Sequence, residues 1–172
     1  EEDEHSSCGV GLIASISGES SREVVEMGIQ ALRVLYHRGA VDADGKTGDG
    51  AGIQLAIPMD FFAEQIERTG HKTNNLPFAV GMVFLPRTNF DSQEKSRILI
   101  ESEIIKEGFK IYGWRHVPIN TKMIGEKAKA TLPEIEQILI GNEMYSNELE
   151  LDDKLYLIRK RIEKKINQEN IN

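Results

Sequence analysis

Several features that mark other protein classes are scarce in this sequence of 172 residues. It has one cysteine and five prolines, and aromatic residues make up 6% of it. A single cysteine excludes an intramolecular disulfide framework and a metal site built from cysteines alone. The 21 basic residues are outnumbered by 28 acidic ones, so the overall positive charge typical of nucleic-acid binding is lacking. No apolar stretch approaches the roughly 18 residues that cross a bilayer. We therefore expect no membrane and no nucleic acid as partners.

What the sequence contains is typical of a globular domain. Hydrophobic residues make up 40% and charged residues 28%, which is enough apolar material for a core. The length fits one domain or a piece of a larger one. A lone cysteine without a secretion signal favours a cytoplasmic location. Residues 1–7 are acidic and lack an apolar segment, so we interpret them as a leader before a domain that starts at Cys8.

Apolar periodicity predicts an alternation of strands and helices. Strands are expected at 10–16, 53–57, 78–85, 109–117 and 135–140, the last with a helix as the alternative. Helices are expected over 20–36, 60–69, 91–107 and 155–166. Ser20 and Asp91 fit capping positions, and Gly108 fits the end of the third helix. This order predicts mixed α/β or α+β layers around a core.

A glycine-rich loop runs from 38 to 52. Its segment 45–47 resembles the end of a phosphate-binding loop, but Ala40 stands where that pattern needs glycine and the flanking strand and helix are reversed. Its segment 42–45 starts like a calcium loop, but the later positions that need Gly and Glu hold other residues. We therefore expect neither nucleotide phosphate nor calcium here. The loop is either a flexible connector or a segment whose residues 50–52 approach a ligand or another strand closely.

Cys8 stands at the start of the first expected strand. A small buried hydrophobic side chain is the commoner role of a single cysteine. As a nucleophile it would need a base, because a thiol with a pKa of about 8.5 is mostly protonated at neutral pH. None of the four histidines has a spacing that places it beside Cys8, so a Cys–His pair stays open without support. Cleavage before Cys8 would supply another base, because the freed α-amine, with a pKa of about 8, lies next to its own thiol.

Motifs spread over the chain resemble the amino-terminal glutaminase domain of glutamate synthases. The motifs nearest the cysteine are Cys8-Gly9-Val10-Gly11, His37-Arg38-Gly39-Ala40 and Thr47-Gly48-Asp49-Gly50-Ala51-Gly52-Ile53. Further matches in order and spacing lie at 81–86, 111–120, 133–137 and 155–163. The resemblance implies a class II amidotransferase with the N-terminal-nucleophile hydrolase fold. That fold is a four-layer αββα sandwich, of which residues 8–172 would form the first part as a partial glutaminase domain.

The resemblance also implies a chemistry. In the family the leader is removed, and the amino-terminal cysteine attacks the side-chain amide of L-glutamine. Ammonia leaves, and the γ-glutamyl thioester is hydrolysed to glutamate. Carried onto this chain, the resemblance makes Cys8 the nucleophile and its freed α-amine the general base. Arg38 and Gly39 would position the amino-terminal residue and shape the substrate pocket, whereas Asp49 and Gly50 would order the loop.

For the full-length enzyme the resemblance implies glutamate synthesis from 2-oxoglutarate. It implies no cofactor in this segment, and FMN and an iron–sulfur cluster elsewhere in that enzyme. The expected partners are L-glutamine, the remainder of the large subunit and a small subunit.

Two family elements are absent from these 172 residues. The family binds the glutamine carboxylate with an Arg in a His-x-Arg-x-Ser-Thr segment and stabilises the oxyanion with an Asn-Gly pair, and both lie further along its sequence. Loss of an oxyanion donor alone costs about 10²–10³ in rate. We therefore expect negligible glutaminase activity from the isolated chain. A partial sandwich would also expose apolar sheet faces and strand edges, so we expect self-association.

Two alternatives remain open. The first is a catalytically inert, truncated remnant of the same ancestry that acts at most as an interaction module. The second, unrelated to the family, is a module that binds a small ligand through the glycine-rich loop.

Overall fold

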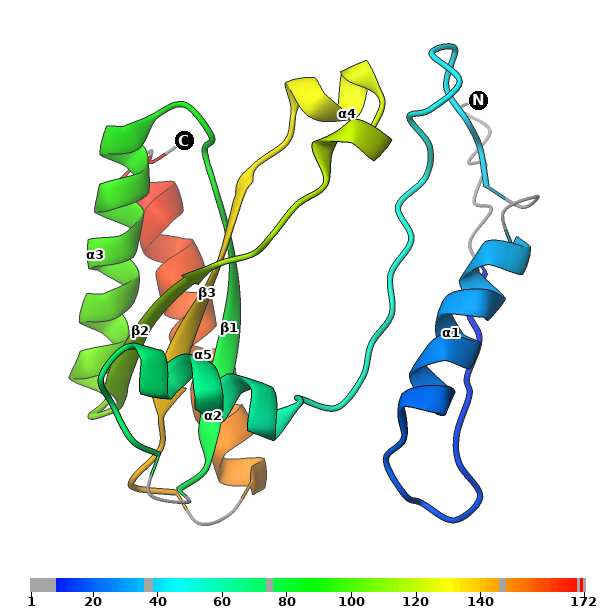
Figure 1. The fold of residues 1–172 in the computed structure, drawn as a ribbon. Coiled ribbons are helices and arrows are strands. Elements are labelled where there is room, and N and C mark those ends of the chain that lie inside the picture. The colour runs from blue at the N-terminus through cyan, green and yellow to red at the C-terminus, as the bar shows by residue number, and fades with distance from the viewer. Residues whose placement is uncertain (1–8, 36–38, 74–75, 146–147, 170, 172) are drawn as a thin grey trace, which may run out of the picture. The chain divides into compact units, whose positions relative to one another are not determined.

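The computed structural model describes residues 9–35, 39–73, 76–145, 148–169 and 171. Contacts divide the chain into two compact units (Figure 1). The first unit comprises Glu1–Ala56 and Asn120–Thr131, and the second comprises Ile57–Ile119 and Leu132–Asn172. The chain thus leaves the second unit for twelve residues and then returns to it. No helix in the described part of the chain is long and apolar enough to cross a membrane.

Three helical elements of the first unit have their bounds within the described residues. They are α1 (Arg22–Val34), the 3₁₀ helix η2 (Thr121–Met123) and α4 (Glu126–Ala130). The side chain of Ser21 caps α1 by accepting the backbone N–H of Val24 at 3.4 Å. The cap is therefore one residue later than predicted. No residue of α1 is buried, so its apolar side chains contribute no closed core to this unit.

The strands expected at 10–16 and 53–57 were wrong. Both segments lack regular structure in the described residues, and Val10, Ile16 and Ile53 are 98%, 107% and 44% exposed. A strand needs a hydrogen-bonded neighbour, and no described strand lies alongside either segment. An apolar pattern thus indicates that a segment can form a strand, but it does not show whether a neighbouring strand is present to hydrogen-bond with it.

The second unit is built on a three-stranded antiparallel sheet of order β1-β3-β2 (Figure 1). The strands are β1 (Phe78–Leu85), β2 (Lys110–His116) and β3 (Glu134–Gly141). All three strands were predicted, and the preference for strand over helix at 135–140 is confirmed. Because β3 lies between the other two, the two edges of this sheet are β1 and β2.

Helices cover both faces of this sheet. They are α2 (Met59–Arg68), α3 (Phe90–Lys106) and α5 (Glu148–Gln168). Ile138 and Ile140 of β3 pack in one core cluster with residues of α3 and α5, whereas Leu139 packs with residues of α2. This alternation follows from the two-residue period of a strand. Figure 1 shows the result, with α3 and α5 on one face and α2 on the other.

The two ends of α3 agree with the sequence prediction to different degrees. Asn89 caps α3 by accepting the N–H of Ser92 at 3.0 Å, two residues before the predicted cap at Asp91. Gly108 follows α3 with a φ of 83°, as predicted for a glycine that ends a helix.

Met82 and Phe84 of β1 are 50% and 63% exposed, so α2 leaves part of its sheet face uncovered.

Candidate functional site

The residues expected at the site are only partly visible. Cys8 and Arg38 lie outside the described residues. Gly39, Asp49 and Gly50 are described, and all three belong to the first unit.

The residue after Cys8 lies against the end of α1. A Cβ at Gly9 would be 3.7 Å from Cδ1 of Leu35, which is an ordinary van der Waals contact. Leu35 is the C-cap residue of α1 and stands three positions before Arg38. The neighbour of the expected nucleophile thus contacts the helix end that leads into the loop with the expected pocket residues.

The loop that follows is closed into a hairpin between Ala40 and Asp49, which we call the loop hairpin. The Asp49 N–H donates to Ala40 O at 3.2 Å, and the Ala40 N–H donates to Asp49 Oδ2 at 3.0 Å. Val41 and Gly48 form an antiparallel bridge. A Cβ at Gly48 would lie 2.8 Å from Ala40 O, so this crossing requires glycine. Asp49 therefore fastens both backbone groups of the residue that follows Gly39.

The tip of the loop hairpin is organised by the Asp44 carboxylate. Its Oδ1 accepts the N–H groups of Lys46 at 2.9 Å and Thr47 at 2.7 Å, and its Oδ2 accepts the Thr47 hydroxyl at 2.6 Å. These hydrogen bonds, with the Thr47 hydroxyl as the largest cause, hold the pKa of Asp44 well below its ordinary value. Gly45 supplies the left-handed φ of 68° that the turn needs. Residues 42–47, whose sequence resembles parts of phosphate-binding and calcium-binding loops, thus form a turn.

The segment Asn120–Thr131, which we call the clamp segment, contacts this tip. A Cβ at Gly125 would overlap the Thr47 hydroxyl and the Asp44 carboxylate, and it would lie 2.5 Å from the Thr47 backbone nitrogen. The Lys127 ammonium donates to Asp42 Oδ2 at 2.6 Å. Sequence reasoning missed these contacts, because no local pattern connects residues 85 positions apart.

Residues 50–52 do not approach another described part of the chain closely. A Cβ at Gly50 or Gly52 would meet nothing within 4 Å, whereas the tight contact occurs at Gly48. Among the described glycines of this loop, Gly45 is the one with a left-handed φ. The glycine content of the loop therefore serves one turn and one backbone crossing, and the backbone at Gly50 is open.

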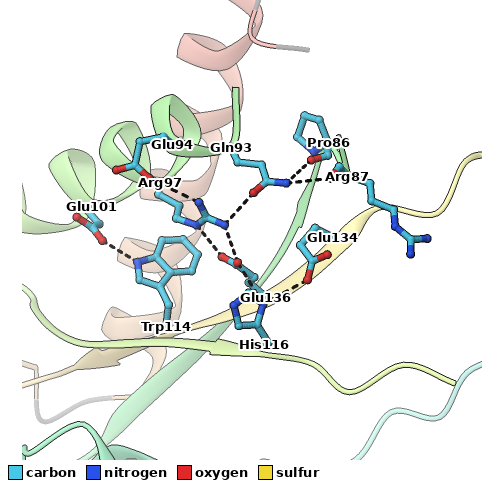
Figure 2. Close-up of polar contacts among 10 residues, drawn as sticks. All are labelled: Pro86, Arg87, Gln93, Glu94, Arg97, Glu101, Trp114, His116, Glu134 and Glu136. Carbon is cyan, nitrogen blue, oxygen red and sulfur yellow. Dashed lines mark hydrogen bonds and ion pairs between the residues drawn. The ribbon is translucent and has the colours of Figure 1, made fainter. Parts of the chain in front are cut away.

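A second polar cluster lies in the second unit, between α3 and the sheet (Figure 2). Arg97 of α3 donates to both oxygens of Glu136 on β3, from Nε at 2.9 Å and from Nη2 at 2.7 Å. The Glu136 side chain is 2% exposed, and its hydrogen bonds raise the pKa of Arg97. Gln93 accepts from Arg97 at 3.2 Å and donates to Pro86 O at 2.7 Å. This cluster therefore binds α3 to the central strand and to the end of β1.

The histidine in this cluster has carboxylate partners. His116 Nδ1 lies 3.2 Å from Glu134 Oε1 and 3.4 Å from Glu136 Oε1 (Figure 2). The second unit contains no cysteine, because Cys8 belongs to the first unit. Every buried side-chain nitrogen and oxygen among the described residues has a hydrogen-bond partner. The arrangement is thus a satisfied network that stabilises the core, and a Cys–His pair gains no support from it.

Metal binding has no site in the described part of the chain. There, no group of three or more His, Cys, Asp or Glu side chains is arranged to hold an ion.

Comparison with known proteins gives close relatives. The family described as glutamine amidotransferases class-II matches residues 8–172. The large chain of NADPH glutamate synthase from Azospirillum brasilense is 55% identical over 171 residues, which cover 99% of this chain and 11% of that protein. Ferredoxin-dependent glutamate synthase 2 from Synechocystis is 38% identical over 170 residues, which cover 95% of this chain and 10% of that protein.

A third relative has the same coverage pattern. The large chain of NADPH glutamate synthase from Bacillus subtilis is 38% identical over 165 residues, which cover 93% of this chain and 10% of that protein. The chain therefore spans about a tenth of the length of the curated relatives that it matches.

Proposed function

The chain belongs to the class II glutamine amidotransferases, and on that premise we propose that it is the glutaminase part of a glutamate synthase. It releases ammonia from L-glutamine, and the longer protein uses this ammonia to make glutamate from 2-oxoglutarate. The observation that carries the proposal is the family match, which spans residues 8–172 and begins at the cysteine. The similarity to glutamate synthases of both the NADPH and the ferredoxin type supports it.

In the proposed mechanism one residue acts as nucleophile and base. Removal of residues 1–7 frees the α-amine of Cys8, which takes the proton of the thiol. The thiolate attacks the amide carbon of glutamine. The ammonium form of the amine then protonates the amide nitrogen as the C–N bond breaks, so that the nitrogen leaves as ammonia. Water then attacks the γ-glutamyl thioester, which releases glutamate and restores the thiol. Because one residue supplies both the nucleophile and the base, the proposed reaction needs no histidine.

The contacts around the loop support the roles proposed for its residues. We propose that Arg38 and Gly39 position the amino-terminal residue and shape the substrate pocket. On one side of them lies Leu35, whose Cδ1 would be 3.7 Å from a Cβ at Gly9, and on the other side Ala40 is fastened at the base of the loop hairpin. The residue that follows Gly39 is thus held in place by two hydrogen bonds.

Asp49 and Gly50, which lie at the end of the loop hairpin, have a different proposed role from Arg38 and Gly39. We propose that Asp49 and Gly50 order the loop, because Asp49 bonds both backbone groups of Ala40. The open backbone at Gly50 leaves room beside that anchor.

For the complete domain we propose the four-layer αββα sandwich, with the three-stranded sheet of the second unit as part of one of its two sheets. An iron–sulfur cluster is commonly held by four cysteine thiolates. This chain has one cysteine, so its residues do not fit a cluster. We place the cluster and FMN in other parts of the synthase. The remainder of the large subunit and a small subunit are the proposed protein partners, and the proposed location is the cytoplasm.

The test uses the full-length protein that carries this segment. Ammonia release from glutamine is measured for the wild type and for Cys8→Ala, and glutamate formation from added ammonium serves as the folding control. We expect Cys8→Ala to lose the glutamine-dependent reaction and to keep the ammonium-dependent one, because added ammonia bypasses the thiol. Glutamine-dependent ammonia release by Cys8→Ala at the wild-type rate would overturn the proposal.

A further inference from the structure

The clamp segment is a stretch of the first unit that interrupts the second. It begins at Asn120, just after β2, and ends at Thr131, just before β3. Within the first unit it contacts the tip of the loop hairpin through the backbone at Gly125 and through the side chain of Lys127, and the Lys127 backbone also bonds to Asp44. Several contacts from one short segment therefore meet at this tip.

The contact at Gly125 is steric. A Cβ at this position would fall on top of the Asp44–Thr47 turn, at distances that real Cβ atoms essentially never show. The Asp44 carboxylate and the Thr47 hydroxyl are engaged with each other at 2.6 Å, so neither can move aside without breaking the turn. Any side chain at 125 must push the clamp segment and the hairpin tip apart.

The contact at Lys127 is electrostatic. Its ammonium lies 2.6 Å from Asp42 Oδ2, while Asp42 Oδ1 accepts the N–H of Ala43 at 2.6 Å. The two side chains are 66% and 34% exposed, so the pair contributes little to stability by itself. The pair places the hairpin tip beside α4, because Lys127 belongs to that helix.

Cross-links connect the tip of the loop hairpin to its base. They are the Asp42 N–H bond to Thr47 O at 2.6 Å, the bridge from Val41 to Gly48, and the paired bonds at the base. The base holds Ala40, which directly follows Gly39.

We propose that Gly125 and Lys127 are positioning residues of the glutaminase site, which act by holding the tip of the loop hairpin and, through the cross-links of the hairpin, placing Gly39 beside its base. The inference rests on the proposed function. It predicts that a change in the clamp segment is felt in the handling of glutamine, because a misplacement of about 1 Å at a site can cost about 10²-fold in rate.

The test measures KM and kcat for glutamine-dependent ammonia release in the full-length protein. We expect Gly125→Ala to lower kcat/KM by about 10- to 100-fold, mainly through a higher KM. Lys127→Ala removes an exposed pair, so we expect a loss of about two- to fivefold. Lys127→Arg keeps the charge and restores most of the lost kcat/KM. Ammonium-dependent glutamate formation stays at the wild-type level in all three variants.

Lys129→Ala is the matched control. Lys129 lies on the same helix and pairs with Glu126 at 2.7 Å within that helix, so its removal leaves kcat/KM unchanged. Wild-type KM and kcat/KM in both Gly125→Ala and Lys127→Ala would overturn the inference. So would an equal loss in Lys129→Ala or an equal loss of the ammonium-dependent reaction, because either means general destabilisation. If Gly125→Ala does not fold, the comparison of Lys127→Ala with Lys127→Arg decides.

These outcomes are separate from a failure of the proposed function. If Cys8→Ala keeps full glutamine-dependent activity, the glutaminase assignment itself falls. If Cys8→Ala is inactive and the clamp variants behave as the wild type, only the role of the clamp segment falls.

Discussion

Removal of Arg97 tests how the second unit holds α3 against its sheet. In Arg97→Met the Glu136 carboxylate loses two hydrogen bonds, of 2.9 Å and 2.7 Å, while its side chain stays 2% exposed. Loss of one partner of a buried ion pair costs about 3–5 kcal/mol. Arg97 is 23% exposed and His116 lies 3.4 Å from the same carboxylate, so we expect a smaller loss of about 2–3 kcal/mol in the free energy of unfolding.

The assay uses the single tryptophan of the chain. Trp114 lies on β2 and donates to Glu101 of α3 at 2.6 Å, so its emission reports on the second unit alone. Urea titration followed by this emission gives the midpoint and the free energy of unfolding. We expect a clearly lower midpoint for Arg97→Met than for the wild type.

Two further variants make this prediction refutable. The double variant Arg97→Met/Glu136→Leu replaces both charges with apolar side chains, and it should regain most of the lost stability. Arg68→Met is the matched control, because Arg68 pairs with Glu64 on the surface of α2 and the two side chains are 65% and 59% exposed. Equal midpoints for Arg97→Met and Arg68→Met, or a double variant less stable than Arg97→Met, would refute the reasoning.

Three other predictions follow from the same contacts. Hydrogen bonds from Lys106 and then Lys165 hold the pKa of Glu103 below its ordinary value of 4.5, so the stability they add is present above that pH and is lost as the pH falls through the folded-state pKa. The urea midpoint should therefore drop on acidification, and less so in Glu103→Gln, whereas equal drops would contradict this. Gly141→Ala places a Cβ 2.7 Å from the Tyr112 ring and should cost about 1–3 kcal/mol in the same titration, which an unchanged midpoint would exclude. The isolated 172-residue chain should release negligible ammonia from glutamine, and a rate above that of a variant without the cysteine would disprove it.

Sequence reasoning succeeded where structure depends on local pattern. The strands β1, β2 and β3 carry apolar runs or alternation closed by Pro86, by the segment after His116 and by Gly141, and each was placed within one residue or so of its observed bounds. The end of α3 was also predicted, because Gly108 is the residue type that a left-handed φ requires. The capping residues were displaced by one or two positions, since Ser20 and Asp91 have neighbours that can also cap.

Sequence reasoning failed where the structure depends on contacts between residues far apart in the chain. Residues 10–16 and 53–57 have the composition of strands, but their composition does not specify which chain they pair with. The short helix α4 has five residues, too few for a helical period to be visible. Lys127 and Asp42 are 85 positions apart, and no local pattern marks them as partners. The contact of the clamp segment with the loop hairpin therefore had no signal in the sequence.

The residues of the site stay a prediction, and the structure adds contacts around them that the sequence did not indicate. Cys8, Arg38, Gly39, Asp49 and Gly50 came from motif resemblance, and the described contacts add how Asp49 fastens the loop. Two patterns set aside as false phosphate and calcium loops are structural after all, because Asp44 uses their side chains and backbone to close a turn. A motif that fails one functional context can thus still dictate local geometry.

The most direct test of the account is the mass of the amino-terminal peptide of the mature full-length protein after exposure to a thiol-directed analogue of glutamine. The account predicts a peptide that begins at Cys8 and carries one equivalent of the analogue on its sulfur, with glutamine protecting it in competition. A mature peptide that still contains residues 1–7, or one that begins at Cys8 and stays unlabelled, would contradict the claim that this cysteine and its own α-amine form the catalytic pair.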